Sequence, residues 1–212
     1  MMMPRIELSY SAWQLWKSSK KEKDLTKNRF YLYYIKDRHY ENPETIFGKK
    51  IADGLKKKKT KDKEVEFCRS FLPVPKYREK ELHVVIDGVP ILCQLDGDSL
   101  DIIDEFKTGH LDPKGKAPWS QKKADNWDQL TIYMMVKWRL TGKNPKGRLS
   151  WIPTKKVFTG KFNKKGEEIY KIALSGEFPK TWITERSIKD YMLLFAELKK
   201  TYEEIQEFFK NI

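Results

Sequence analysis

Residues 81–107 constrain the fold most, because they follow the pattern of three consecutive strands joined by two tight turns. The expected strands are 81–86, 89–96 and 100–107, with Asp87-Gly88 in the first turn and Gly97-Asp98 in the second. An Asp-Gly pair between two such runs is a strong signal for a hairpin turn. The stretch therefore predicts a three-strand meander.

Helical patterns precede the meander. Helices are expected from Ser9, as N-cap, to about Ser18, over residues 25–37, and from Pro43 to about Lys58. Proline is favoured in the first turn of a helix, because its missing N–H has no intrahelical partner there. The N-terminal part, residues 1–60, is thus predicted to be helical.

The chain after the meander combines helices and strands. A loop is expected at residues 110–120, and an apolar stripe then predicts a helix over 123–141: Trp127, Leu130, Met134 and Trp138. Strands are expected at 147–153, 155–162 and 168–174, and a last amphipathic helix begins at Thr184 or Ser187. This order predicts an α/β (α+β) fold, a mixed β-sheet flanked by helices.

Two carboxylates and a lysine are expected to meet at one end of this sheet. Side chains alternate along a strand, so Glu105 and Lys107 share a face and Phe106 points the other way into the core. Asp96 ends the neighbouring strand. Judged by spacing alone, a lysine beside carboxylates on a strand is more often a surface ion pair than a catalytic group.

The same group of residues suits phosphodiester hydrolysis. Mg²⁺ or Mn²⁺ prefers hard oxygen ligands, here Asp96, Glu105 and the backbone carbonyl of Phe106. Such a metal lowers the pKa of a bound water and neutralises charge on the scissile phosphate. Lys107 is then expected to orient the attacking water or to stabilise the transition state.

These residues carry a resemblance to a known family. Leu95-Asp96-Gly97 followed by Asp104-Glu105-Phe106-Lys107-Thr108-Gly109 resembles two motifs of the RecB-like exonuclease branch of the PD-(D/E)XK nucleases. The next helix carries Gln129 and Tyr133, which resemble the Q-x-x-x-Y motif of that branch and lie on one helical face. The resemblance implies a restriction-endonuclease-like core and a catalytic set of Asp96, Glu105, Lys107, Gln129 and Tyr133.

The resemblance is weaker upstream. Residues 47–55 align with an F-G-x-x-x-H-x-x-L helix of the branch, but Ala52 stands where the metal-binding histidine is expected. Asp53 is the alternative metal ligand, and a solvated helix residue is the competing interpretation. The Q-x-x-x-Y resemblance also implies DNA contacts for Gln129 and Tyr133. Lys49, Lys50 and Thr108 are further expected DNA contacts.

Charge and composition limit the partners. Lys and Arg total 43 against 30 Asp and Glu, a net charge of +13 that favours polyanions such as DNA. The run Lys56–Lys63 is either a solvated loop or a phosphate-contact patch.

The two cysteines, Cys68 and Cys93, are too few for the four-cysteine iron–sulfur cluster of many RecB-like relatives. The absence of a long apolar run, a secretory leader and a Gly-rich phosphate loop predicts a cytoplasmic protein with no membrane partner and no nucleotide cofactor.

The sequence thus predicts a single nuclease domain over residues 1–212, with its catalytic core at 79–175 and a C-terminal helix at 184–210. The expected activity is a Mg²⁺- or Mn²⁺-dependent deoxyribonuclease, most simply an exonuclease of DNA recombination, repair or phage DNA processing. A structure-specific endonuclease, a DNA-binding module that has lost catalysis and an RNA-directed protein are the alternatives. A recombination or replication partner and a homo-oligomer stay open.

Overall fold

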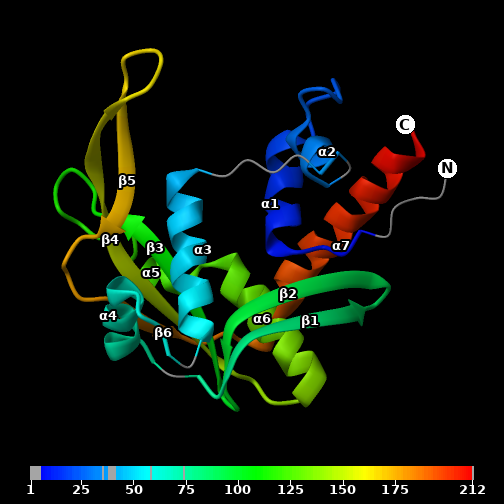
Figure 1. The fold of residues 1–212 in the computed structure, drawn as a ribbon. Coiled ribbons are helices and arrows are strands. Elements are labelled where there is room, and N and C mark those ends of the chain that lie inside the picture. Colours follow the sequence, from blue (N-terminus) through cyan, green and yellow to red (C-terminus); the bar gives the residue numbers. More distant parts are fainter. Residues whose placement is uncertain (1–5, 35, 38–41, 58, 74, 212) are drawn as a thin grey trace.

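A six-stranded mixed sheet with helices on both faces forms the protein (Figure 1). The computed structural model describes residues 6–34, 36–37, 42–57, 59–73 and 75–211. Strands β1 (Tyr77–Ile86), β2 (Val89–Asp98), β3 (Ile102–His110), β4 (Lys146–Phe162) and β5 (Glu168–Leu174) are neighbours in that order, and β6 (Lys180–Thr184) pairs with β4. The predicted fold class is confirmed.

The first three strands form the predicted meander, and the next connection crosses over. β1, β2 and β3 pair antiparallel, whereas β3 and β4 run parallel. Asp87 (φ 45°) and Gly88 (φ 83°) both have positive φ, as the tight turn between β1 and β2 requires. The parallel pair needs a long crossover, which α5 (Gln121–Asp125) and α6 (Asp128–Thr141) supply.

Two separate cores hold the helices onto the sheet. The larger lies beneath α1 (Tyr10–Ser19), α6 and α7 (Ile188–Lys210), with Trp13, Ile91, Leu130 and Tyr191 fully buried. The smaller lies on the other face, beneath α3 (Pro43–Lys56) and α4 (Lys63–Phe71), and includes Phe47, Ile51, Val65 and Ile152. Phe106 packs against this smaller core, as alternation along β3 predicts.

Helix ends follow local capping chemistry. The Ser9 side chain accepts from the Ala12 N–H at 3.1 Å, and Ser187 caps α7 in a capping box with Asp190, so α7 begins after Ser187 rather than Thr184. Helix α2 (Arg29–Tyr34) is shorter than the predicted 25–37, because the Asn28 side chain accepts from the Tyr31 N–H at 3.0 Å and starts the helix there. Residues 35 and 38–41 lie outside the described part of the chain.

Further elements differ from the sequence prediction. The helix expected over 123–141 is two helices, α5 and α6, with a break at Asn126 and Trp127. Helix α4 was not predicted, and the Asp62 side chain caps it by accepting from the N–H groups of Glu64 and Val65. The two strands expected at 147–153 and 155–162 are one strand, β4. β6, also not predicted, pairs with β4 as far as Trp151, and β5 takes over at Thr154, so the apparent break marks a change of partner.

Among the described residues, no helix combines the length and the apolar character needed to cross a membrane.

Candidate active site

Strands β2 and β3 separate at the point where the predicted residues lie. The two strands pair only at Gly97 with Asp104 and Asp98 with Ile103. Beyond these pairs the N–H of Phe106 donates to Oδ2 of Asp96 at 2.6 Å. The carboxylate therefore satisfies a backbone donor that the neighbouring strand no longer reaches.

Glu105 and Lys107 point into the space that this separation opens. Lys107 Nζ lies 2.6 Å from Oε1 of Glu105, whose side chain is almost fully buried. The ammonium also lies 5.2 Å from the centre of the Trp127 ring, a cation–π distance. The predicted convergence of Glu105 and Lys107 on one face of β3 is present.

Helix α6 holds Glu105 from the other side. Gln129 Nε2 donates to Oε1 of Glu105 at 2.9 Å and to the hydroxyl oxygen of Tyr133 at 2.8 Å. Gln129 and Tyr133 are one turn apart on α6, so both face β3. The Q-x-x-x-Y pair thus contacts the predicted catalytic carboxylate directly.

The electrostatics of Glu105 are unusual. Burial raises the pKa of its carboxyl to about 8, with a further contribution from the negative charge of Asp96, while Lys107 and Gln129 oppose the rise. Burial works against the charge of Lys107, yet the adjacent Glu105 carboxylate raises the pKa of this lysine above its usual value. Oε2 of Glu105 is buried and accepts no hydrogen bond from the described residues.

These features suit a divalent cation. A buried carboxylate oxygen without a hydrogen-bond partner, next to a second carboxylate, is a hard-oxygen donor set of the kind that Mg²⁺ and Mn²⁺ accept. Among the described residues, no group of three or more His, Cys, Asp or Glu side chains is gathered closely enough to hold a metal. Asp96 and Glu105 would therefore be the side-chain ligands, with the Phe106 carbonyl as a further expected donor.

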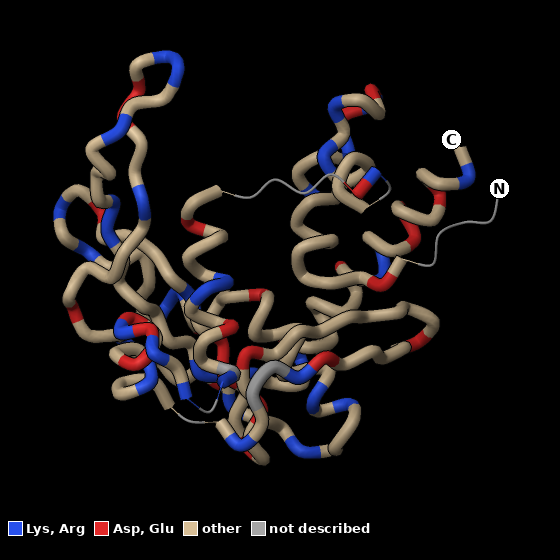
Figure 2. Tube along the Cα trace, viewed as in Figure 1, with Lys and Arg blue, Asp and Glu red and all other residues tan. Residues whose placement is uncertain are grey.

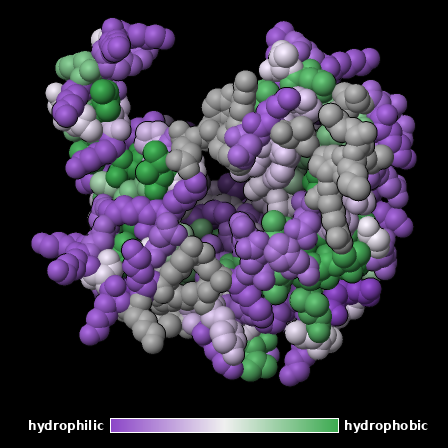
Figure 3. All heavy atoms as spheres, turned by 45° about the vertical axis from the view of Figure 1, so that its right-hand side comes forward, coloured by the Kyte–Doolittle hydropathy of each residue, from purple (hydrophilic) through white to green (hydrophobic). Residues whose placement is uncertain are grey.

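Two cavities flank the carboxylate pair. One, of about 570 Å³, is lined by Asp96, Glu105, Lys107, Gln129 and Tyr133. The other, of about 450 Å³, is lined by Asp96, Glu105 and Lys107 together with Phe106 and Thr108. Lys49 and Ala52 of α3 line both cavities, so α3 stands between them. The surface is hollowed in this region and is largely hydrophilic (Figure 3).

Gly48 lets α3 approach the sheet here. A Cβ atom at Gly48 would lie 3.3 Å from the hydroxyl oxygen of Thr108, tighter than ordinary van der Waals contact. The absence of a side chain therefore brings Lys49 and Ala52 to the cavity walls.

The remaining predicted residues differ in their placement. Asp53 lines the larger cavity, yet no three-carboxylate group forms there among the described residues, so its role as a ligand stays a prediction. Lys50 lies 2.8 Å from Asp62 and 2.6 Å from Glu64 and lines neither cavity. In the Lys56–Lys63 run, Lys58 is outside the described residues, and Lys57, Lys59, Lys61 and Lys63 are exposed.

Sequence reasoning missed an aromatic wall beside Lys107. Trp127 was predicted to lie on the apolar stripe of the helix, but it is the N-cap residue of α6. Its ring packs 4.7 Å from that of Trp119, and its Nε1 donates to the Tyr10 hydroxyl at 3.4 Å. The only feature of the sequence that pointed to this wall was the position of Trp127, two residues before Gln129.

Comparison with known proteins supports the fold rather than a family. No protein-family model matches the chain, and no curated protein matches it. The structure is similar to that of a candidate exonuclease from Eubacterium rectale, with a TM-score of 0.52 and 8% sequence identity over 94% of this chain and 80% of the other. A second solved structure, SSO0001, has a TM-score of 0.42 and 16% identity over 94% of this chain and 78% of the other. The chain thus has a nuclease-like fold.

Proposed function

We propose that this protein is a metal-dependent nuclease of the PD-(D/E)XK type that hydrolyses phosphodiester bonds in DNA. The observation that carries the proposal is the buried Glu105 carboxylate, which Lys107 and Gln129 both contact and which lines a cavity together with Asp96. If Glu105 and Lys107 formed only a surface ion pair, the hydrogen bond from Gln129 of α6 to the Glu105 carboxylate would have no role. The arrangement is better suited to fixing a reactive group in place.

Asp96 and Glu105 would hold Mg²⁺ or Mn²⁺. When bound, such an ion would activate a water molecule and neutralise charge on the scissile phosphate. The raised pKa of Glu105 fits this assignment, because a neighbouring cation would favour the ionised carboxylate that burial disfavours.

The other side chains have separable tasks. Lys107 keeps its proton, because Glu105 raises its pKa, and its charge can stabilise the phosphate in the transition state or orient the attacking water. Gln129 fixes Oε1 of Glu105, and Oε2 accepts no hydrogen bond from the part of the chain that the structure describes. Tyr133 accepts from Gln129, so it orients the amide rather than the carboxylate itself.

Charge and exposed aromatics favour a nucleic-acid substrate. The net charge is +13, and Figure 2 places lysines along the hairpin of β4 and β5 that projects from the sheet. This β4–β5 arm, residues 155–171, also exposes Phe158, Phe162 and Tyr170. Lysines bind phosphates, and exposed rings stack on bases, so the arm suits DNA that lies against this side of the protein.

Exonuclease action of the RecB-like branch is the form we favour. The Q-x-x-x-Y pair is typical of that branch, and the neighbour from Eubacterium rectale carries the name of a candidate exonuclease. A DNA-binding module without cleavage is the alternative, and Ala52 favours it, because this residue lines both cavities where the branch has a metal-binding histidine. Recombination, repair or phage DNA processing is the setting that we propose.

Digestion of end-labelled linear DNA and covalently closed circular DNA tests the proposal. Wild type and Lys107→Ala are compared with Mg²⁺, with Mn²⁺ and with EDTA. Metal-dependent loss of linear DNA alone, absent in the variant, is the expected result for an exonuclease. Cleavage of circles would assign an endonuclease, and binding without cleavage in any metal would favour the DNA-binding module.

A further inference from the structure

A third cavity, which several lysines line, lies next to the candidate active site. It has a volume of about 300 Å³, and its walls include Lys76, Lys80, Asp98, Ser99, Lys137 and Lys143. We call it the lysine pocket. Four lysines line it against a single aspartate, so its formal charge is strongly positive. No residue of this pocket was assigned a function from the sequence.

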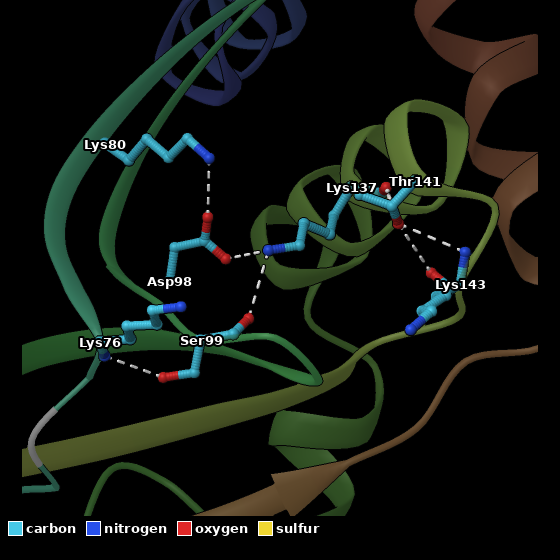
Figure 4. Close-up of polar contacts among 7 residues, drawn as sticks. All are labelled: Lys76, Lys80, Asp98, Ser99, Lys137, Thr141 and Lys143. Carbon is cyan, nitrogen blue, oxygen red and sulfur yellow. Dashed lines mark hydrogen bonds and ion pairs between the residues drawn. The ribbon is translucent and has the colours of Figure 1, made fainter.

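Asp98 organises the floor of the pocket. This carboxylate is 1% exposed, and it pairs with Lys80 of β1 at 3.0 Å and with Lys137 of α6 (Figure 4). Lys137 is itself almost fully buried and also donates to the Ser99 carbonyl at 3.2 Å. Asp98 therefore fixes two ammonium groups from two different elements at one point.

Asp98 does not account for the other two lysines. Lys76 and Lys143 lie on either side of Ser99 in Figure 4, and both side chains are exposed. Like charges that share a small cavity repel one another unless an anion lies between them. The Lys76 and Lys80 ammonium groups also lie 5.2 and 5.9 Å from the ring centre of Tyr77, which is 54% exposed. Lysines interleaved with an exposed aromatic ring are typical of a nucleic-acid surface.

The pocket continues the row of active-site residues. Asp96 and Asp98 are two positions apart on β2 and so lie on one face of that strand. On one face of α6, successive turns carry Gln129, Tyr133 and Lys137. Lys137 is about 12 Å along the helix from Gln129. Lys80 lines both this pocket and the larger active-site cavity. A strand bound at Glu105 that follows α6 would reach the pocket.

We propose that the lysine pocket binds a phosphate group of the nucleic-acid substrate at a fixed distance from the scissile bond. Lysine is a point-charge ligand for phosphate, and the pocket presents several such donors. The separation of about 12 Å between Gln129 and Lys137 along α6 corresponds to roughly three or four nucleotides of duplex. The phosphate is either an internal phosphodiester or a strand-terminal phosphomonoester. This inference rests on the proposed function.

The test uses Lys76→Ala/Lys143→Ala, because these lysines do not pair with Asp98. Replacing Lys137 would leave a buried carboxylate short of a partner and endanger folding. The control, Lys199→Ala/Lys200→Ala, removes the same charge from exposed positions on α7. Thermal unfolding should be alike for both variants, and a pocket variant that alone unfolds early would mark these lysines as structural and overturn the proposal.

Binding is measured in EDTA, by fluorescence anisotropy of labelled oligonucleotides over a range of salt concentrations. For the pocket variant, the slope of log affinity against log salt should fall by about one, whereas the control should match wild type. Equal slopes for the two variants would overturn the proposal.

A scan with single uncharged methylphosphonate linkages then locates the phosphate. Neutralising one position should weaken wild type but leave the pocket variant unchanged. If such a position is an internal linkage, the pocket binds a phosphodiester. If instead wild type distinguishes a 5′-phosphate end from a 5′-hydroxyl end and the pocket variant does not, the pocket binds a terminal phosphate. If no position affects wild type more than the pocket variant, the phosphate-binding role of the pocket is overturned, but the proposed function is not. Absence of any nucleic-acid binding by wild type would overturn the proposed function together with it.

Discussion

The carboxylate of Asp96 accepts a hydrogen bond from the backbone N–H of Phe106 at 2.6 Å, across the point where β2 and β3 separate. Because Glu105 and Lys107 are the residues on either side of Phe106, this bond sets the position of Asp96 relative to both. The main chain of β3 therefore fixes the positions of Asp96, Glu105 and Lys107 relative to one another.

The first prediction concerns Asp96. Asp96→Asn keeps an oxygen that can accept from Phe106 but removes the negative charge. Metal-dependent cleavage should fall by at least about 100-fold, whereas thermal stability should change little, because the hydrogen bond survives. Cleavage rates at saturating Mg²⁺ and an unfolding curve measure the two effects. Wild-type cleavage by this variant would remove Asp96 from the catalytic set.

The second prediction concerns stability and pH without metal. Folding raises the pKa of Glu105 from its usual 4.5 to about 8, so the folded protein keeps a proton that the unfolded chain has already lost. The stabilisation from this group is therefore fully present below pH 4.5 and is lost as the pH rises to about 8. The loss is on the order of a few kcal/mol.

Glu105→Gln provides the comparison, because glutamine can still accept from Gln129 and does not titrate. Melting curves in EDTA between pH 4 and 9 should show wild type losing stability relative to the variant as the pH rises. A difference that is constant with pH would contradict the buried, raised-pKa carboxyl.

The third prediction links the metal to the same proton. Below about pH 8, a cation that binds Glu105 must displace its proton, so affinity for Mn²⁺ should rise roughly tenfold per pH unit and level off above pH 8. Calorimetry in buffers of different ionisation enthalpy should detect up to one proton released for each ion bound. Glu105→Gln should release none. Tight, pH-independent binding by wild type would place the metal elsewhere.

The fourth prediction separates Gln129 from Tyr133. Gln129 donates to Glu105, whereas among the described residues the Tyr133 hydroxyl forms a hydrogen bond with Gln129 and not with Glu105, so both are positioning residues of unequal weight. Gln129→Ala should weaken metal affinity or cleavage roughly 10- to 100-fold, and Tyr133→Phe should have a smaller effect. In the double variant, Tyr133→Phe should add nothing once Gln129 is gone. Additive losses would show that Tyr133 acts independently of the amide.

The parts of the molecule that depend on local chemistry could be predicted from the sequence. Asp87-Gly88 specifies its own turn through positive φ, and alternation along one strand is sufficient to bring Glu105 and Lys107 together. Helix α4 has a local signal in Asp62, but the lysine run before it hid that signal. β6 has no local signal, since it depends on the edge of β4 that β5 leaves open.

The surroundings of the site depend on contacts between distant residues. Asp98 and Lys137 are 39 positions apart, and their pairing depends on how α6 crosses β2. The Trp127 ring lies near Lys107 because α6 starts at Asp128, directly after Trp127, and no periodicity in the sequence marks that start. Motifs locate the reactive groups, whereas the groups that surround them emerge only from packing.

The last prediction concerns the β4–β5 arm. Phe162 is 60% exposed near the tip and contacts Phe158 at a ring distance of 5.4 Å, so it supports no core. Phe162→Ala should weaken DNA binding in EDTA by roughly fivefold or more, the loss expected for one stacked base, without lowering the melting temperature. Phe178→Ala is the matched control, because Phe178 is 63% exposed but lies off the arm, against Phe67 and Phe71. If the two variants bind equally well, the arm does not hold bases and the lysines alone would carry its contribution; if only Phe162→Ala binds weakly, the arm reaches the substrate.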